Sequence, residues 1–365
     1  MTDRETIRYI DLGAEYAAIR AQVQQCLEQV FAAGDFILRD EVRRFETSIC
    51  KLTGAVHAVG VNSGFDALRL SLECLELAPG DEVIVPAYTF IATAAAVVEA
   101  GGVPVFADCG EDLNIDPLEI SRLVSSRTRA VIPVHLHGRP CDMDTIMDLS
   151  RDWGLAVIED ACQAFGSTLH QRAVGTFGDF GCFSLHPLKS LSVPGDGGFI
   201  LTGNDRHADR LRCRRDHGRK EGKYIMPGVN SRLDNLHASV ANLKLEHFSD
   251  WAAARGSAAR RYAQALAHVP GVKTLPEPGG AEVVWSCYPL ICDGARDLRD
   301  VLHEAGIEHL PGFDPPVHKL PPFVSKTVLP RAERLAPMVT LLPMHPFLKP
   351  LEITRVAQAV KDAVL

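Results

Sequence analysis

Between residues 55 and 202, short apolar runs alternate with amphipathic segments, and this alternation is the strongest constraint on the fold of the chain. Seven runs have the length and composition of buried strands: VHAVGV, DEVIVP, VPVFAD, RAVIPVHL, LAVIED, DFGCFSL and GFILT. Segments with helical periodicity separate the earlier runs, at residues 65–77, 90–99, 117–124 and 143–153. Strand–helix–strand units favour right-handed crossovers, so the pattern predicts an α/β fold with a mostly parallel seven-stranded sheet and helices on both faces.

The segments on either side of this region have a different pattern. Residues 14–52, 205–217 and 234–270 have helical patterns. Beyond residue 270 the chain offers a strand (VVWSCYPLIC), a helix leading into a strand (ARDLRDVLHEAGIEH) and a closing amphipathic helix (PLEITRVAQAVKDAV). We therefore predict a large domain over residues 1–250, which includes the N-terminal helical segment, and a smaller α+β C-terminal domain over residues 251–365.

Composition and charge argue against several classes of partner. The formal net charge is −8, which disfavours nucleic acid as the main partner. The N-terminal stretch MTDRETIRYIDLG is charged, and no apolar run reaches the roughly 18 residues that span a bilayer. The ten cysteines form no C-x-x-C pair and are expected to be reduced thiols. We expect a cytoplasmic protein that binds neither membrane nor nucleic acid.

A metal site is not predicted. His135 and His137 lie two residues apart in VIPVHLHG, on one face of a predicted strand, and such a pair can in principle ligate a metal. The sequence places no carboxylate or cysteine partner beside them. Packing at the end of a strand is therefore the favoured interpretation.

Two stretches place polar groups at the carboxyl ends of predicted strands, where open α/β sheets bind ligands. In VNSGFDAL, Ser63 and Gly64 stand where a strand turns into a helix. This turn is either a phosphate cradle or a plain helix cap provided by Asn62 or Ser63. In LAVIEDACQAFG, Glu159 and Asp160 end an apolar strand. A carboxylate there is either bonded to backbone amides or paired with a cation from a ligand.

A third stretch, CFSLHPLKSLSVPGDGGFILT, places Lys189 between two apolar runs. Most lysines are solvated surface groups, but an amine that loses hydration becomes neutral more readily and can then attack a carbonyl. Ser184 and His186 alternate with apolar neighbours and are candidates for the same pocket. The glycine-rich end of the stretch allows an immediate return to the next strand, either as a simple turn or beside a bound group.

One cofactor needs all of these groups. Pyridoxal 5'-phosphate (PLP) requires a lysine for its aldehyde, a carboxylate for its pyridinium nitrogen, a cradle for its phosphate and a flat side chain against its ring. Lys189, Asp160, the turn at Ser63 and Gly64, and Phe90 meet these four needs. Lys189 is then the natural base for the α-proton of a bound substrate.

The whole chain resembles the DegT-type sugar aminotransferases, PLP-dependent enzymes of fold type I in the aspartate aminotransferase superfamily. The matching stretches occur in family order: GDEVIVPAYTFIATAAAV, PVFADCGEDLNIDP, VIEDACQAFGS, FSLHPLKSL, GDGGFILT, GVNSRLDNLHAS and LLPMHPFL. The resemblance implies a homodimer with shared active sites. It also implies a transaminase of amino-sugar biosynthesis, which takes an amino group from L-glutamate, carries it as pyridoxamine 5'-phosphate (PMP) and gives it to a keto-sugar that is usually nucleotide-linked.

The same resemblance implies roles for residues around the cofactor ring. Lys189 forms the Schiff base, Asp160 pairs with the ring nitrogen and Gln163 approaches the ring hydroxyl. Phe90 stands where the family stacks an aromatic residue on the ring, and His186 is expected near the lysine and the substrate.

Other residues are implied to hold the phosphate. Ser184 and the backbone of Gly64 and Phe65, in the turn that begins at Ser63, belong to this group, and Asn230 reaches the phosphate from the partner subunit. Phe65 replaces a small hydroxyl residue that is common in the family, so one side-chain contact is expected to be missing. The loop SVPGDGG and the serine in NSR also depart from the family pattern, which leaves the sugar specificity open.

Substrate contacts are less constrained by the sequence. The basic run at residues 206–223 is either a solvated helix face or a site where Arg219, Lys220 or Lys223 meets the diphosphate of a nucleotide-sugar. His318, in PPVHKLPPF, is either a lid residue near the sugar or a structural residue.

The sequence also bears on other functions. Amination of a cyclitol, or of a free eight-carbon keto-acid sugar, remains open. Relatives that act as sugar dehydratases carry histidine in place of the lysine, so Lys189 argues against that activity. A regulator or scaffold on a retired aminotransferase fold predicts the loss of the lysine or the aspartate, and the sequence retains both.

Overall fold

The computed structural model describes residues 6–293, 295–323 and 325–364. Its central sheet has seven strands in the order β1-β9-β8-β5-β4-β2-β3. β9 runs antiparallel to both of its neighbours, and the other neighbouring pairs run parallel. The strands are β1 (His57–Val61), β2 (Glu82–Pro86), β3 (Val103–Ala107), β4 (Thr128–Val131), β5 (Ala156–Asp160), β8 (Phe180–Ser184) and β9 (Gly198–Thr202). Each predicted strand is present, and the mostly parallel seven-stranded sheet is confirmed.

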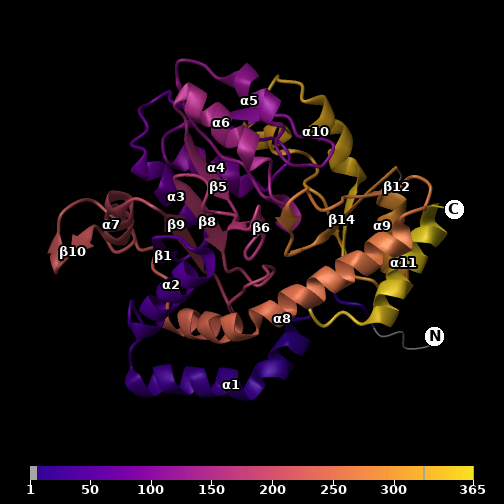
Figure 1. The fold of residues 1–365 in the computed structure, drawn as a ribbon, viewed down its shortest axis with the longest axis horizontal. Helices are drawn as coiled ribbons and strands as arrows, with labels where there is room; N and C mark the ends of the chain where they lie inside the picture. Colours follow the sequence, from indigo (N-terminus) through magenta and orange to yellow (C-terminus); the bar gives the residue numbers. More distant parts are fainter. Residues whose placement is uncertain (1–5, 294, 324, 365) are drawn as a thin grey trace.

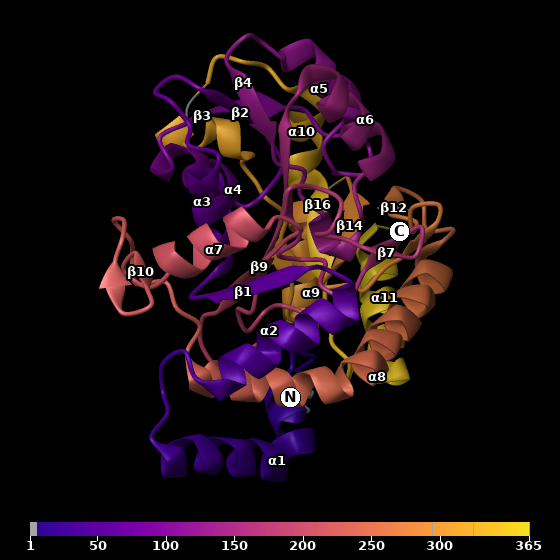
Figure 2. The same ribbon diagram turned by 60° about the vertical axis from the view of Figure 1, so that its left-hand side comes forward.

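Helices cover both faces of this sheet, as Figure 2 shows. In β2, Val83 and Val85 belong to the core formed with α3, α4 and α7, whereas Ile84 belongs to the core formed with α5 and α6. This division follows from the alternation of side chains along a strand. The helices are α2 (Asp40–Thr53), α3 (Gly64–Cys74), α4 (Ile91–Glu99), α5 (Pro117–Leu123), α6 (Met143–Trp153), α7 (Asp205–Arg214) and α8 (Asn235–Leu266).

A second, antiparallel sheet lies in the C-terminal part of the chain, with the order β12-β14-β16-β15. Tyr262 of α8 packs in its core together with residues of α9 and α11. The elements are β12 (Val272–Thr274), β14 (Tyr288–Cys292), α9 (Ala295–Glu304), β15 (Leu310–Pro311), α10 (Pro330–Leu335), β16 (Val339–Leu342) and α11 (Pro350–Val364). The predicted domain boundary at residue 250 falls inside α8, whose two halves pack in different cores, and it stays a prediction.

Three peripheral features complete the architecture. α1 (Leu12–Ala33) packs along α8, away from the central sheet (Figure 1). A hairpin of β10 (Arg219–Lys220) and β11 (Lys223–Tyr224) projects from the body beyond α7 (Figure 1). A small sheet joins β6 (Thr168–Leu169), β7 (Arg172–Ala173) and β13 (Ala281–Glu282). Among the described helices, none is both long and apolar enough to cross a membrane.

Candidate active site

The turn between β1 and α3 meets the ends of two other strands. The Ser63 hydroxyl accepts a hydrogen bond from the Asp66 amide at 3.1 Å, so Ser63 is the N-cap of α3. A Cβ atom on Gly64 would lie 2.8 Å from the Cys162 Sγ and 2.8 Å from the Ser184 Cβ. Glycine is therefore required where α3 approaches the segments that follow β5 and end β8. The first-turn amides of a helix lack intrahelical partners, so this corner can bind an anion such as phosphate.

The glycine-rich return after Lys189 also approaches this corner. A Cβ atom on Gly198 would lie 2.5 Å from the carbonyl carbon and oxygen of Ser63. Gly198 pairs with Val61 in the sheet, directly before the turn. Backbone proximity, and not turn formation alone, therefore requires glycine at this position.

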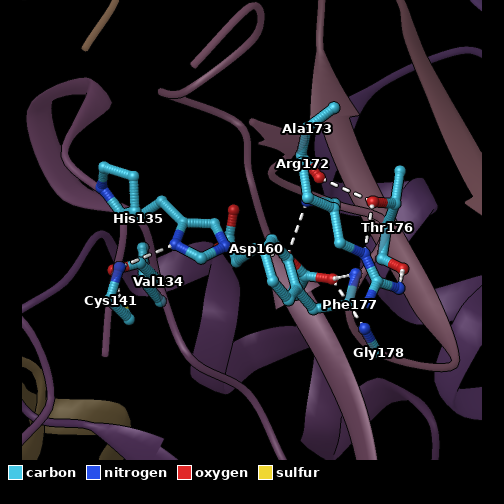
Figure 3. Close-up of polar contacts among 12 residues, drawn as sticks. Val134, His135, Cys141, Asp160, Arg172, Ala173, Thr176, Phe177 and Gly178 are labelled. Atoms are coloured by element: carbon cyan, nitrogen blue, oxygen red, sulfur yellow. Dashed lines mark hydrogen bonds and ion pairs between the residues drawn. The ribbon is translucent and has the colours of Figure 1, made fainter. Parts of the chain in front are cut away.

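Glu159 and Asp160 end β5 but have different environments. Glu159 is completely buried, and its carboxylate accepts hydrogen bonds from the amides of Gly175, Phe177 and Gly178 at 2.6, 2.6 and 2.7 Å. Its Oε2 also lies 3.1 Å from the Nε2 of His135. Figure 3 shows Phe177 and Gly178 folded back against the end of this strand. Glu159 therefore has the structural role that the sequence left open.

Asp160 keeps part of its bonding capacity free. Its Oδ2 accepts a hydrogen bond from the Thr93 hydroxyl at 2.9 Å, and its Oδ1 accepts one from the Cys162 amide at 3.2 Å. An ionised carboxylate has about four acceptor sites, so Asp160 can accept a further donor such as a protonated ring nitrogen. Sequence reasoning missed Thr93; its only signal is its position three residues after Phe90, on the helix that follows β2.

Lys189 lies in a turn between β8 and β9, where its amide donates to the His186 carbonyl at 2.8 Å. The side chain is half-buried, and among the described residues its amine forms no ion pair or hydrogen bond. The charges of this amine and of Asp160 both act on the thiol of Cys162. Burial raises the pKa of the Cys162 thiol well above its ordinary value, the charge of Asp160 adds to the rise and the charge of Lys189 opposes it. This thiol lies beside the turn at Gly64.

His186 begins the same turn. Burial lowers the pKa of His186, the charge of Lys189 lowers it further, and Asp196 opposes both effects. Its Nδ1 accepts a hydrogen bond from the Leu188 amide at 3.2 Å, which leaves the proton of the neutral ring on Nε2. The exposed imidazole is thus a neutral group with its N–H edge free to contact a ligand.

Two further residues predicted for the cofactor lie on separate segments. Phe90 is the N-cap residue of α4 and is 58% exposed, with its ring centroid 6.4 Å from that of Phe313. Gln163 is oriented by its side-chain oxygen, which accepts a hydrogen bond from the His137 amide at 2.8 Å. Its amide nitrogen is the donor that remains for a ligand.

The two histidines of VIPVHLHG take part in different networks. The Nδ1 of His135 accepts from the Cys141 amide at 3.0 Å (Figure 3), and its Nε2 faces Glu159. The Nδ1 of His137 lies 3.0 Å from the Cys287 Sγ, and burial lowers the pKa of His137 to about 3. No group of three or more His, Cys, Asp or Glu side chains that could hold a metal occurs in the described part of the chain.

Asn230 lies on an exposed segment after the β10–β11 hairpin and forms an isolated bridge with Asp216. Its neighbour Ser231 donates to the Asn62 side chain at 3.1 Å, next to the turn at Ser63 and Gly64.

The predicted substrate contacts divide into two groups. Arg219, Lys220 and Lys223 are exposed on the β10–β11 hairpin, and the amine of Lys220 bonds Asp209 at 2.9 Å. His318 is fully buried, and its Nε2 lies 3.1 Å from the Glu333 carboxylate. A sugar cannot touch His318 in this arrangement, so the structure favours the structural alternative for this residue.

The geometry now fits a known family. The model of the DegT/DnrJ/EryC1/StrS aminotransferase family matches residues 17–361. The chain belongs to this family. It is 38% identical over 99% of its length to the UDP-N-acetyl-3-dehydro-alpha-D-glucosamine 3-aminotransferase of Acidithiobacillus ferrooxidans, 99% of which is covered.

Solved structures of DegT/DnrJ/EryC1/StrS aminotransferases and related proteins share the fold. The crystal structure of Streptomyces venezuelae DesV in complex with a ketimine intermediate superposes with a TM-score of 0.95, at 37% identity and with 98% of each chain covered. NtdA from Bacillus subtilis, solved with bound cofactor PMP, superposes with a TM-score of 0.87 at 29% identity, covering 94% of this chain and 81% of NtdA. The predicted family and fold class are confirmed.

Proposed function

We propose that this aminotransferase uses PLP bound at Lys189 to transfer the amino group of L-glutamate to a nucleotide-linked keto-sugar. One observation carries the proposal: at the carboxyl edge of the sheet lie an amine with no ion pair or hydrogen bond among the described residues, a buried carboxylate with lone pairs left over and a glycine-lined helix N-terminus. These are the groups that PLP requires. The full-length similarity to an enzyme named for a UDP-linked sugar supports the substrate class.

Different groups would hold the phosphate and the ring nitrogen. The backbone amides of Gly64 and Phe65 and the hydroxyl of Ser184 hold the phosphate, because glycine lets these segments approach closely. Asp160 pairs with the ring nitrogen through its remaining lone pairs. When bound, PLP supplies an electron sink for the substrate carbanion.

Other side chains are proposed to carry out the chemistry and to orient the PLP ring. Lys189 would hold PLP through its aldehyde, and its amine, which has no ion pair or hydrogen bond among the described residues, would serve as the base for the α-proton of the substrate. Gln163 donates to the ring hydroxyl, and Phe90 covers one ring face. His186 presents its N–H edge to the substrate.

The proposed enzyme is a homodimer in which the hairpin and the segment after it reach the second site. Tyr224 and Ile225 are 74% and 58% exposed on this projection, and large apolar side chains of this kind are typical of a protein interface. Asn230 would then contact the phosphate of the other subunit. Arg219 and Lys223 are the proposed diphosphate contacts, since Lys220 is already paired with Asp209.

A substrate panel tests the proposal. Purified protein is incubated with PLP, L-glutamate and keto-sugars that are free or linked to dTDP, UDP or GDP, and 2-oxoglutarate and amino-sugar are quantified by mass spectrometry. We expect both products with at least one nucleotide-linked substrate. Product from only a cyclitol ketone or a free eight-carbon keto-acid sugar would shift the assignment to those alternatives. No 2-oxoglutarate with any acceptor would contradict the proposal and favour a non-enzymatic role.

A further inference from the structure

Asp160 is held by a chain of two buried hydroxyl groups. The Oγ1 of Thr93 donates to the Oδ2 of Asp160 at 2.9 Å, and the Oγ1 of Thr89 lies 3.1 Å from the Oγ1 of Thr93. Both threonines are buried. A hydroxyl group has one proton, and Thr93 gives its proton to the carboxylate, so Thr89 is the donor to Thr93.

The bond from Thr93 differs from those of the two threonines in α2. In α2, Thr47 donates to the Arg43 carbonyl and Thr53 to the Ile49 carbonyl, each at 2.8 Å and four residues back. This local bond is the usual one for a threonine within a helix. Thr93, in the first turn of α4, instead directs its proton out of the helix to a carboxylate on β5. The hydroxyl thus joins two elements that meet at the candidate site.

Because of the position of Thr93, its hydrogen bond to Asp160 bears on the cofactor site. α4 begins directly after Phe90, so one helical turn carries both the side chain assigned to the ring face and the donor that holds Asp160. We propose that Thr93 is a positioning residue that fixes Asp160 relative to Phe90, with Thr89 orienting the Thr93 hydroxyl. This inference rests on the proposed PLP-dependent function.

A hydrogen bond donated to a carboxylate is stronger than one between neutral groups, so loss of the Thr93 hydroxyl should have a measurable effect on the Asp160 site.

Binding of PMP to the full-length, cofactor-free protein tests the role of Thr93. Thr93→Val removes the hydroxyl at nearly constant volume, Thr93→Ser keeps it, and Thr89→Val removes the orienting donor. Thr53→Val is the matched control, because that hydroxyl donates to a backbone carbonyl in another helix. Equilibrium dialysis gives the dissociation constant, and thermal unfolding of the cofactor-free proteins reports their stability.

We expect Thr93→Val to weaken PMP binding about tenfold. Thr93→Ser should retain most of the affinity, because it keeps the hydroxyl. Thr89→Val should weaken binding about threefold, and this variant still tests the inference if Thr93→Val does not fold. Thr53→Val should leave PMP binding unchanged.

Two results would overturn the inference in distinguishable ways. If the wild type binds PMP and the variants at Thr93 and Thr89 bind it within about twofold of the wild type, the positioning role is wrong while the proposed function stands; any loss of thermal stability in these variants then shows a packing role only. If the wild type itself does not bind PMP, the proposed function and the inference both fail.

Discussion

Glu159 and Asp160 are neighbours on one strand, and the contrast between them shows how a structural carboxylate differs from one that can still bind a ligand. Glu159 is surrounded by three backbone amides and a histidine, so its acceptor capacity is used within the fold. Asp160 accepts two donors and keeps lone pairs at the edge of the sheet where open α/β sheets bind ligands. Both carboxylates are buried, so burial alone does not separate them; the remaining bonding capacity of Asp160 is what supports its proposed role.

Removal of the Asp160 charge should have the largest effect on activity. In Asp160→Asn the side-chain oxygen can still accept from Thr93 or Cys162, so the fold should persist, but the proposed ionic partner of the ring nitrogen is lost. We expect kcat/KM to fall about 1000-fold. Steady-state kinetics with a thermal melt would measure this. Activity close to the wild-type level would contradict the role given to Asp160.

The equivalent change at Glu159 should instead reduce stability. Glu159→Gln turns an amide donor towards the backbone N–H groups of Gly175, Phe177 and Gly178, and leaves buried donors unpaired. We expect a loss of about 3 kcal/mol in the free energy of unfolding, measured by urea denaturation.

An exposed glutamate provides the control for this prediction. Glu246 pairs with Arg44 at the surface, so Glu246→Gln should change the free energy of unfolding by less than about 1 kcal/mol. Equal losses in the free energy of unfolding for Glu159→Gln and Glu246→Gln would contradict the structural role of Glu159.

The turn at Gly64, which is proposed to hold the phosphate, should be sensitive to one added methyl group. Gly64→Ala places a Cβ atom 2.8 Å from Cys162 and Ser184, so the helix N-terminus must move away from Ser184. We expect PLP affinity to fall about tenfold, with a loss of about 1–3 kcal/mol in the free energy of unfolding. Gly203→Ala is the control, because its Cβ would meet no atom within 4 Å. Similar PLP affinities for both variants would show that this turn does not hold the phosphate.

The smallest effect is expected at the hairpin. Lys223→Ala should raise KM for a nucleotide-linked sugar about threefold with kcat unchanged, and high salt should reduce the difference. Lys220→Ala should have a weaker effect, since its amine already bonds Asp209. A larger effect at Lys220 than at Lys223 would contradict the assignment of the diphosphate contacts.

The fold was predictable because its central strands are buried on both faces. A strand such as β2 packs in two cores at once and therefore appears in the sequence as a continuous apolar run. The location of Asp160 at the end of a strand and of Lys189 just after one was predictable for a related reason, whereas their roles stay predictions. Polar residues that end such runs collect at one edge of the sheet, whatever the details of the loops.

Long-range packing determines the features that the sequence could not give. Glu159 is structural because residues 175–178 fold back onto it, and no local pattern specifies that return. Thr93 could not be assigned, since its partner lies 67 residues away. His318 is enclosed because its segment packs against Phe106 and Glu333, whereas the sequence shows only a histidine in a proline-rich stretch.

Location of the covalent cofactor link tests the account most directly. The protein is loaded with PLP, reduced with borohydride, digested and mapped by mass spectrometry, with Lys189→Ala and Lys244→Ala treated in parallel. The account predicts that the reduced pyridoxyl group lies on Lys189, is absent in Lys189→Ala and remains in Lys244→Ala. A label on another lysine, or no label on the wild-type protein, would contradict it.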